Sequence, residues 1–215
     1  MYWRFERYWR ELRERLARPH RCPVLVFGNQ KSGTSAFAAL LGKATGVRAA
    51  LDLQREYESP SYPRVVAGEQ SLTGFVERNT LEFSYPIVKE PNFLVLWREL
   101  LERFPDSPRV LVMRDPRDNL RSILDRLGVA GDRGVLGDDE RAANGPGWAL
   151  YLDGRWLGID ATHYIDVMAH RWNLGYEFLC ANRADTVLVR YEDFLEDREG
   201  TVFQEARAVG LTPRY

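Results

Sequence analysis

The sequence predicts a three-layer α/β domain built on a central parallel sheet. Short apolar runs alternate along the chain with longer segments in which apolar residues recur at helical spacing. The first apolar run, at 24–27, leads through a glycine-bounded loop directly into a helical segment. Strands that alternate with helices favour a parallel sheet covered on both faces, with its ligand site at the carboxyl ends of the strands.

The expected strands and helices follow from the spacing of the apolar residues. Short apolar runs bounded by polar residues, Gly or Pro are predicted as strands, at 24–27, 47–53, 85–88, 110–113 and 186–189. Longer periodic stretches are predicted as helices, at 35–43, 71–78, 93–104, 116–127, 164–181 and 199–209. Pro116 opens its helix at the first position, where the missing amide proton is not needed.

The chain is expected to form one domain preceded by a helix. Its 215 residues, 45% of them hydrophobic, are enough to bury one core. We expect an amphipathic helix and a linker over residues 1–22 and the α/β domain over 23–215. The helix is expected to pack on its own domain, and contact with an acidic membrane surface is the alternative. Its apolar face consists of Phe5, Tyr8, Trp9, Leu12 and Leu16.

An insertion rich in Gly and Asp is expected at about 128–161. Within it, Asp153-Gly154 stands between alternating aromatic and apolar residues, which predicts a β-hairpin. The insertion is well placed to cover an acceptor pocket as a lid or wall, and a flexible surface loop is the alternative. The aromatic residues that favour a flat or apolar acceptor surface are Trp148, Tyr151, Trp156 and Tyr164.

Charge and cysteine content narrow the class of partner. The formal net charge is −1 and the isoelectric point is about 6.3, so attraction to nucleic acid is not expected. There is no run of ~18 apolar residues and no signal-like start, which argues against a transmembrane segment and against export. Cys22 and Cys180 lack metal-ligand spacing. We therefore expect a cytoplasmic protein with reduced cysteines and no metal site.

The loop after the first strand has the composition of an anion site. It reads Gly28-Asn29-Gln30-Lys31-Ser32-Gly33-Thr34-Ser35. A strand that turns into a helix in this way aims unpaired amide groups and the positive end of the helix dipole at one point. A nucleoside triphosphate loop needs Lys directly after its second glycine, but Thr34 follows Gly33 here. Lys31 precedes that glycine, so the sequence predicts a phosphate or sulfate site of another kind. A turn without a ligand is the alternative.

A second segment predicts a further phosphate contact. The expected strand 110–113 is followed by Arg114-Asp115-Pro116-Arg117-Asp118-Asn119-Leu120-Arg121-Ser122, which passes into a helix. In a parallel sheet, Arg114 would project near the first loop, and Ser122 would lie about two turns into the helix. A guanidinium and a hydroxyl can together bind a phosphate. A surface ion pair between Arg114 and Asp115 is the alternative.

These two segments and a third resemble the sulfotransferases that use 3′-phosphoadenosine 5′-phosphosulfate (PAPS). The third segment, 187–197, is similar to the family strand that ends in Y-E-D-[LF], and its tyrosine is Tyr191. The resemblance implies a P-loop-like fold and a site that holds PAPS, the product being adenosine 3′,5′-bisphosphate. It implies that Arg114 and Ser122 bind the 3′-phosphate and that Tyr191 lies against the adenine. The residues implied to bind the 5′-phosphosulfate are Lys31, Ser32, Gly33, Thr34 and Ser35.

The resemblance also implies a reaction, which is transfer of a sulfuryl group to a hydroxyl or amine of a small-molecule, lipid or sugar acceptor. Lys31 is the first cation expected at the reacting group, and Lys89, at the end of the strand 85–88, is the second. The histidine that serves as base in the cytosolic branch is replaced by Pro91. Glu90 becomes the leading candidate for the base, or else it pairs with Lys89 and orients it.

The sequence also offers other candidates for the general base and other possible functions. The competing bases are Asp52, Glu56 and His163. In the cytosolic branch an R-K-G segment near the C-terminus completes the 3′-phosphate site, and this sequence has no match to it. The resemblance then implies either a smaller site, as in other branches, or completion by Arg121, Arg190 or a further segment. A P-loop nucleotide kinase and a non-catalytic module that binds adenosine bisphosphate are the alternative functions. The acceptor and the oligomeric state do not follow from the sequence.

Overall fold

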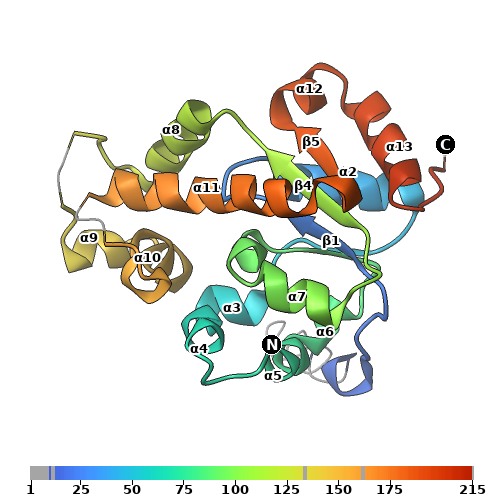
Figure 1. The fold of residues 1–215 in the computed structure, drawn as a ribbon, viewed down its shortest axis with the longest axis horizontal. Coiled ribbons are helices and arrows are strands. Elements are labelled where there is room, and N and C mark those ends of the chain that lie inside the picture. The colour runs from blue at the N-terminus through green and yellow to red at the C-terminus, as the bar shows by residue number, and fades with distance from the viewer. Residues whose placement is uncertain (1–9, 11–12, 133–134, 161–162, 215) are drawn as a thin grey trace, which may run out of the picture.

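The protein is represented by a computed structural model that describes residue 10 and the ranges 13–132, 135–160 and 163–214. A five-stranded sheet with the order β2-β3-β1-β4-β5 forms its centre (Figure 1), and every pair of neighbouring strands is parallel. The prediction of an α/β fold around a parallel sheet is confirmed. The strands are β1 (Val24–Phe27), β2 (Ala49–Ala50), β3 (Ile87–Lys89), β4 (Arg109–Met113) and β5 (Thr186–Arg190).

Helices of different lengths cover the sheet and build the insertion. The helices between β1 and β4 are α2 (Thr34–Thr45), α3 (Gln54–Glu58), α4 (Tyr62–Val66), α5 (Leu72–Arg78), α6 (Thr80–Phe83) and α7 (Trp97–Arg103). Those that follow β4 are α8 (Pro116–Leu127), α9 (Asp138–Ala142), α10 (Pro146–Leu152), α11 (Tyr164–Asn182), α12 (Tyr191–Glu196) and α13 (Arg198–Ala208). Short 3-10 turns are η1 (Pro91–Val95), η2 (Arg155–Leu157) and η3 (Arg183–Asp185).

The two faces of the sheet carry separate apolar cores because side chains alternate along each strand. From β1, Leu25 and Phe27 join a core with residues of α5, α7 and α11, including Phe178 stacked 4.5 Å from Phe27. Val24 and Val26 point to the other face and join residues of α2, α12 and α13. In Figure 1, α11 crosses in front of the strands and α2 lies behind them. All four residues of β1 are buried, as expected for a central parallel strand.

The expected strand at 47–53 is much shorter in the structure. Only Ala49 and Ala50 pair with β3, at the edge of the sheet, and α3 begins at Gln54. The chain leaves the sheet here because its polar groups bond elsewhere. Asp52 pairs with Lys89 at 2.7 Å, and the Leu53 amide donates to Glu90 at 3.2 Å. The helix expected at 93–104 is likewise divided, into η1 and α7.

The hairpin expected at Asp153-Gly154 is wrong, because the residues before it form α10. Pro146 starts this helix at its first turn. Its buried residues Tyr151 and Leu152 stand three and four positions after Trp148, which is helical spacing. Asp153 then ends the helix, and its carboxylate accepts from the Arg155 amide at 3.1 Å. The aromatic pattern is therefore one face of a helix and not the alternation of a strand.

The described part of the insertion packs between α8 and α11. The buried residues of this third apolar cluster are Ile123, Leu127, Leu136, Tyr151, Leu152, Tyr164 and Met168. In Figure 1 the segment lies at the left, beside the N-terminal half of α11. Its position brings α10 into contact with α3, and residues of both helices line the cavity described below.

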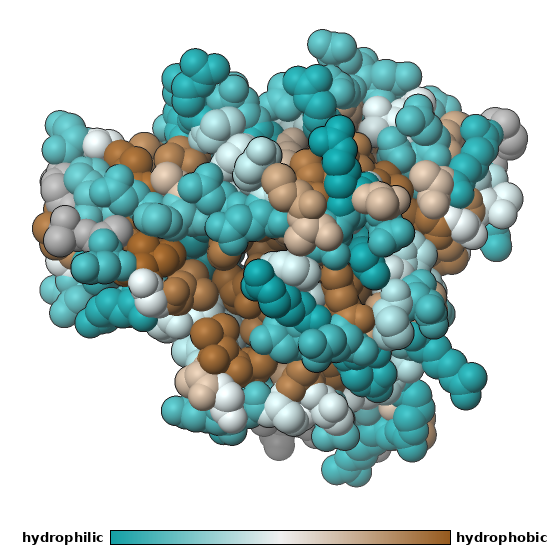
Figure 2. Space-filling view, viewed as in Figure 1, coloured by the Kyte–Doolittle hydropathy of each residue, from teal (hydrophilic) through white to brown (hydrophobic). Residues whose placement is uncertain are grey.

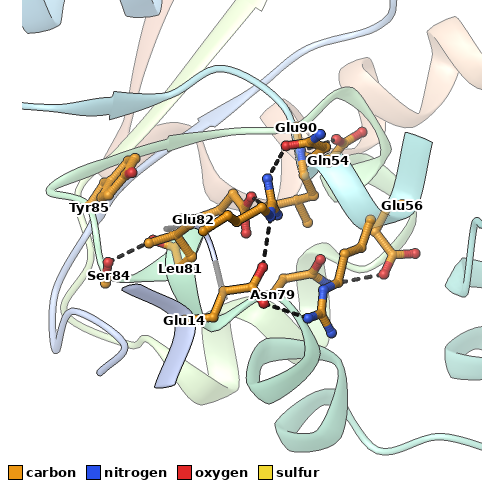
Figure 3. A network of polar contacts seen from close by, with 12 residues as sticks. Glu14, Gln54, Glu56, Asn79, Leu81, Glu82, Ser84, Tyr85 and Glu90 are labelled. Carbon is orange, nitrogen blue, oxygen red and sulfur yellow. Dashed lines mark hydrogen bonds and ion pairs between the residues drawn. The ribbon is translucent and has the colours of Figure 1, made fainter. Parts of the chain in front are cut away.

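The expected N-terminal helix lies largely outside the described residues, and so do Phe5, Tyr8, Trp9 and Leu12. Residues 13–16 are helical, and Leu16, expected on the apolar face, is 74% exposed. A polar network, shown in Figure 3, ties this segment to α3 and α6. Arg10 binds Glu82 at 2.8 Å and also contacts Gln54, while Arg55 binds Glu14 at 2.6 Å. Among the described helices, none has both the length and the apolar composition that crossing a bilayer requires.

Candidate functional site

The loop between β1 and α2 folds tightly and depends on two glycines. Gly28 has a φ of 148°, and a Cβ there would lie 2.5 Å from the carbonyl oxygen of Val112. Gly33 has a φ of 91°, and its Cβ would lie 2.4 Å from the ring of Tyr191. Between them, Lys31 has a φ of 65°, in the left-handed region that non-glycine residues rarely adopt. The loop therefore holds Lys31 in a strained backbone conformation at the carboxyl ends of the strands.

The start of α2 is open to an anion. The helix begins at Thr34 behind Gly33, so no side chain caps it, and its first turn carries no acidic residue. The first amide groups of a helix have no acceptor within the helix itself, and they carry the positive end of its dipole. Lys31 and Ser35 are exposed beside them, whereas Ser32 and Thr34 are buried. The start of α2 therefore leaves amide groups open to an anion beside the exposed Lys31.

Asn119 on α8 holds the loop in place. It is fully buried, and its Nδ2 donates to the carbonyl oxygen of Gln30 at 2.8 Å and to Ser32 Oγ at 3.3 Å. Its Oδ1 accepts from Asn29 Nδ2 at 2.8 Å. Asn119 belongs to the segment 114–122, but no role for it was predicted from the sequence. The signal was available, since Asn119 stands four residues before the buried Ile123 on the same helical face.

Arg114 and Lys31 lie next to each other at the carboxyl edge of the sheet, the place where a parallel sheet predicts that Arg114 projects. Arg114 follows β4, and its Nη1 donates to the carbonyl oxygen of Lys31 at 3.4 Å. Its guanidinium lies 4.7 Å from the centre of the Tyr191 ring, which in turn lies against Gly33. The carbonyl oxygen of Arg114 accepts from Trp172 Nε1 of α11 at 3.0 Å. Four segments of the chain thus meet at the carboxyl ends of β1, β4 and β5.

The alternative role predicted for Arg114 was a surface ion pair with Asp115. Asp115 caps α8 and pairs with Arg117 at 3.2 Å, so the carboxylate is engaged without Arg114. The hydrogen bond from Arg117 lowers the pKa of the Asp115 carboxyl. Ser122 is half-buried two turns into α8.

Arg121 and Arg190, the arginines that could complete the 3′-phosphate site, each pair with an aspartate three positions away in the chain. Arg121 pairs with Asp118 at 3.2 Å, and Arg190 lies 3.5 Å from Asp193. Both pairs are exposed, so each is weak and screened by salt.

The end of β3 brings a buried cation to the same edge of the sheet. Lys89 is 1% exposed, and its Nζ lies 2.7 Å from Asp52 Oδ1. Asp52, and not Glu90, is therefore the carboxylate that pairs with Lys89 and orients it. The alternative in which Glu90 has this role is not the arrangement found.

Glu90 follows Lys89 and is buried. Its carboxylate accepts from the amide of Leu53 at 3.2 Å, and from the backbone amide and the side chain of Asn92 at 3.0 and 3.1 Å. Burial raises the pKa of the Glu90 carboxyl, the charge of Lys89 opposes the rise, and the charge of Asp52 adds to it. A carboxyl with a raised pKa is suited to take a proton near neutral pH.

Two of the competing bases are already occupied. Glu56 is buried, and it accepts from Ser61, from Arg78 Nε at 3.0 Å and from Asn79 Nδ2 at 3.0 Å. Figure 3 shows Glu56 and Asn79 close together. His163 caps α11, where its ring nitrogen accepts from the Ile165 amide at 3.1 Å. Both side chains therefore have structural partners.

A cavity of about 150 Å³ connects the loop, the end of β3 and the insertion. Gln30 comes from the loop, Trp148 from α10, and three carboxylate residues from the segments around β3. Figure 2 shows polar residues over most of one face of the molecule, with apolar surface exposed toward its middle. The residues that line the cavity are Gln30, Asp52, Glu56, Tyr57, Tyr62, Glu90, Pro91, Asn92, Gly147 and Trp148.

Comparison with known proteins gives matches at the level of structure. No family model matches the sequence, and no curated protein matches it. Among solved structures, a sulfotransferase from Mycobacterium tuberculosis H37Rv superposes with a TM-score of 0.56 at 17% identity, covering 94% of this chain and 70% of that one.

Two further structures agree with this match. A sulfotransferase from Alicyclobacillus acidocaldarius superposes with a TM-score of 0.55 at 12% identity, covering 91% of this chain and 83% of that one. The sulfotransferase domain of the curacin biosynthetic pathway gives 0.54 at 13% identity, covering 92% of this chain and 76% of that one. The chain has the fold of the sulfotransferases.

Proposed function

We propose that the protein transfers a sulfuryl group from PAPS to an acceptor that binds in the cavity beside Glu90. The observation that carries this proposal is the meeting of Lys31 and Arg114 at the open start of α2, within a sulfotransferase fold. An ammonium group, uncapped helix amides and a guanidinium at one edge of the sheet are the groups that a donor with two separated anionic ends requires.

The donor would be held by residues at both ends of this cluster. Lys31 and the amides at the start of α2 would bind the 5′-phosphosulfate, with Ser32, Gly33, Thr34 and Ser35 forming the loop around it. Arg114 and Ser122 would bind the 3′-phosphate, and Tyr191 would lie beside the adenosine. The contact of Tyr191 with both Gly33 and Arg114 supports a role for its ring between the two phosphate sites.

The reaction is an in-line displacement at sulfur. A lone pair of the acceptor oxygen or nitrogen forms the new bond to sulfur, and the bond from sulfur to the 5′-phosphate oxygen breaks with its electron pair. The acceptor proton passes to the Glu90 carboxylate. Lys31 matches the charge on the transferring group and on the leaving oxygen, which is where electrostatic stabilisation lowers the barrier most.

Lys89 is proposed as the second cation. Its ion pair with Asp52 holds the ammonium at the end of β3, one residue before Glu90. The positive charge of Lys89 also opposes the rise that burial causes in the pKa of Glu90.

Calorimetry with nucleotides tests the donor site first. Adenosine 3′,5′-bisphosphate should bind without Mg²⁺ and more tightly than ATP, because the loop lacks the lysine that grips a terminal phosphate. Transfer from ³⁵S-labelled PAPS to a panel of alcohols, phenols, amines and sugars then tests catalysis. Mg²⁺-dependent preference for ATP would overturn the proposal in favour of a kinase, and bisphosphate binding without transfer would leave a binding module.

A further inference from the structure

Two buried polar atoms in the cavity wall have no partner. Gln30 Oε1 and the hydroxyl of Tyr62 have no hydrogen bond to any of the described residues. Both residues line the cavity beside Glu90. Buried polar groups are nearly always paired, and leaving one unpaired costs about 1–3 kcal/mol. Two unpaired groups on one cavity wall point to a ligand that completes them.

The hydrogen bonds around Asn92 determine why the side-chain oxygen of Gln30 is unpaired. Arg171, 3% exposed on α11, can only donate, and its Nη2 donates to Asn92 Oδ1 at 2.5 Å. The amide of Asn92 must therefore present its oxygen on that side and its nitrogen to Glu90, at 3.1 Å. Gln30 Nε2 donates to the same Asn92 oxygen at 3.2 Å. The oxygen of Gln30 is left over as an acceptor.

The hydroxyl of Tyr62 has a proton to donate. Tyr62 is 1% exposed at the start of α4, and its ring packs 5.5 Å from that of Phe75. Burial and the charges of Glu90 and Glu56 raise the pKa of the Tyr62 hydroxyl well above its usual value, so it keeps its proton. The hydroxyl faces Glu90 and Asn92 but meets neither at hydrogen-bonding geometry.

The residues that line the cavity favour a ligand group that both donates and accepts hydrogen bonds. Tyr62 offers a proton, whereas Gln30 Oε1 and the Glu90 carboxylate take one. Three carboxylates and no lysine, arginine or histidine are among the described residues that line the cavity, so a carboxylate or phosphate acceptor would be repelled. Lys89 and Arg171 lie behind this lining, where they bond to Asp52 and Asn92. An ammonium group donates but cannot accept from Tyr62. A neutral hydroxyl does both, and the rings of Tyr57 and Trp148 add apolar surface for its carrier.

We propose that this cavity binds a neutral, hydroxyl-bearing ring compound as the acceptor, with Tyr62 and Gln30 holding its hydroxyl beside Glu90. The inference rests on the proposed function for the reaction, but the binding it describes can be measured without transfer. Tyr62 is the specificity-determining residue, since its buried, unpaired hydroxyl has a proton that an acceptor hydroxyl can take and an ammonium group cannot.

The test compares three ligands that differ in one group, namely benzyl alcohol, benzylamine and benzoate. Binding is measured by ligand-observed NMR with adenosine 3′,5′-bisphosphate present. The alcohol should bind at least about tenfold more tightly than the other two, because each of those leaves one buried partner unpaired. Equal binding of all three, or a preference for the amine or the acid, would overturn the inference.

A single-atom variant makes the test sharper. Tyr62→Phe removes only the unpaired hydroxyl, so it should weaken benzyl alcohol binding about tenfold while thermal stability is unchanged or raised. The control is Tyr176→Phe, which alters an exposed tyrosine on α11 that does not line the cavity. Unchanged binding in Tyr62→Phe, or a loss of stability in place of a loss of binding, would refute the role of its hydroxyl.

The failure of this inference and that of the proposed function give different results. Selective alcohol binding without any sulfuryl transfer would keep the subsite and overturn the reaction. Transfer to amines or acids as efficient as transfer to alcohols would keep the reaction and overturn the subsite.

Discussion

The carbonyl oxygen of Lys31 accepts a hydrogen bond from Arg114 Nη1 at 3.4 Å, across 83 positions in the chain. The two residues therefore lie at one site although they follow different strands, β1 and β4, which pair directly. The contact also means that each residue contributes to the position of the other. Substitutions at the two sites are expected to separate binding from turnover, because their side chains reach different parts of the proposed donor.

Removal of the Lys31 ammonium should impair turnover far more than nucleotide binding. Lys31→Ala is expected to lower kcat about 10²-fold or more, because the proposed partner of the ammonium is the transferring group. Binding of adenosine 3′,5′-bisphosphate, which lacks that group, should fall little in calorimetry. An equal loss of bisphosphate affinity would show that the lysine serves the nucleotide and not the sulfuryl group.

The strained backbone of Lys31 gives a second prediction. Lys31→Gly and Lys31→Ala both remove the ammonium, but only glycine adopts a φ of 65° without strain. The glycine variant should be more stable than the alanine variant by roughly 1 kcal/mol in urea unfolding. Equal stability of the two would mean that the left-handed conformation is not kept in solution.

Loss of the Arg114 guanidinium should weaken donor binding. Arg114→Ala is expected to raise the dissociation constant of adenosine 3′,5′-bisphosphate about 10- to 100-fold, as a charged contact to phosphate is lost. Arg117→Ala is the matched control, since Arg117 lies in the same segment but pairs outward with Asp115. A similar effect of both variants would indicate a general charge effect and not a contact of Arg114.

Asn119 is expected to matter for both stability and binding. Asn119→Leu leaves the Gln30 carbonyl, Asn29 and Ser32 without their shared buried partner. We expect a loss of about 2–4 kcal/mol in the free energy of unfolding, with weaker bisphosphate binding as the loop loosens. Asp125→Ala, at an exposed position of α8, should change neither. A stable Asn119→Leu variant with normal binding would refute its role in holding the loop.

The sequence correctly predicted those helices and strands whose ends are determined by residues nearby in the chain. The α8 helix runs from Pro116 to Leu127 as expected, because a proline, an aspartate cap and a terminal Gly128 mark its ends. The edge strand near Ala49 was misjudged, since its length depends on partners far away in the chain. The hairpin at Asp153 was misjudged for a local reason, because the aromatic residues before it have helical spacing and not strand alternation. The length of an edge strand is set by the groups with which its backbone pairs. The spacing of apolar residues in the sequence does not show those groups.

The same distinction holds for the candidate site. Lys31 and Arg114 carry their chemistry in their own motifs, and the structure brings them together. The pairing of Lys89 with Asp52, and the free oxygen of Gln30, depend instead on side chains that converge from separate elements. Asn92 and Arg171, which orient Gln30, belong to no motif that the sequence presents. Positions of this kind are defined by contact, so they emerge only in three dimensions.

The raised pKa of Glu90 predicts how stability depends on pH. The folded protein holds the proton of Glu90 to a higher pH than the unfolded chain, whose carboxyl has its ordinary value near 4.5. Above that pH the unfolded state binds fewer protons, so this group makes stability fall as pH rises toward the folded pKa. Glu90→Gln removes the titration. The stability of the variant relative to the wild type should therefore rise with pH from about 4.5 upward in urea unfolding.

Activity should respond to the same carboxyl with the opposite sign, because a base works only after it has lost its proton. With PAPS and an alcohol acceptor, kcat/KM of the wild type should rise with pH as Glu90 ionises, and Glu90→Gln should be low and lack this rise. The two measurements together separate a base from a structural carboxylate. A variant that changes the stability profile but keeps the rise in activity would move the base to Asp52, which lines the same cavity and is more exposed.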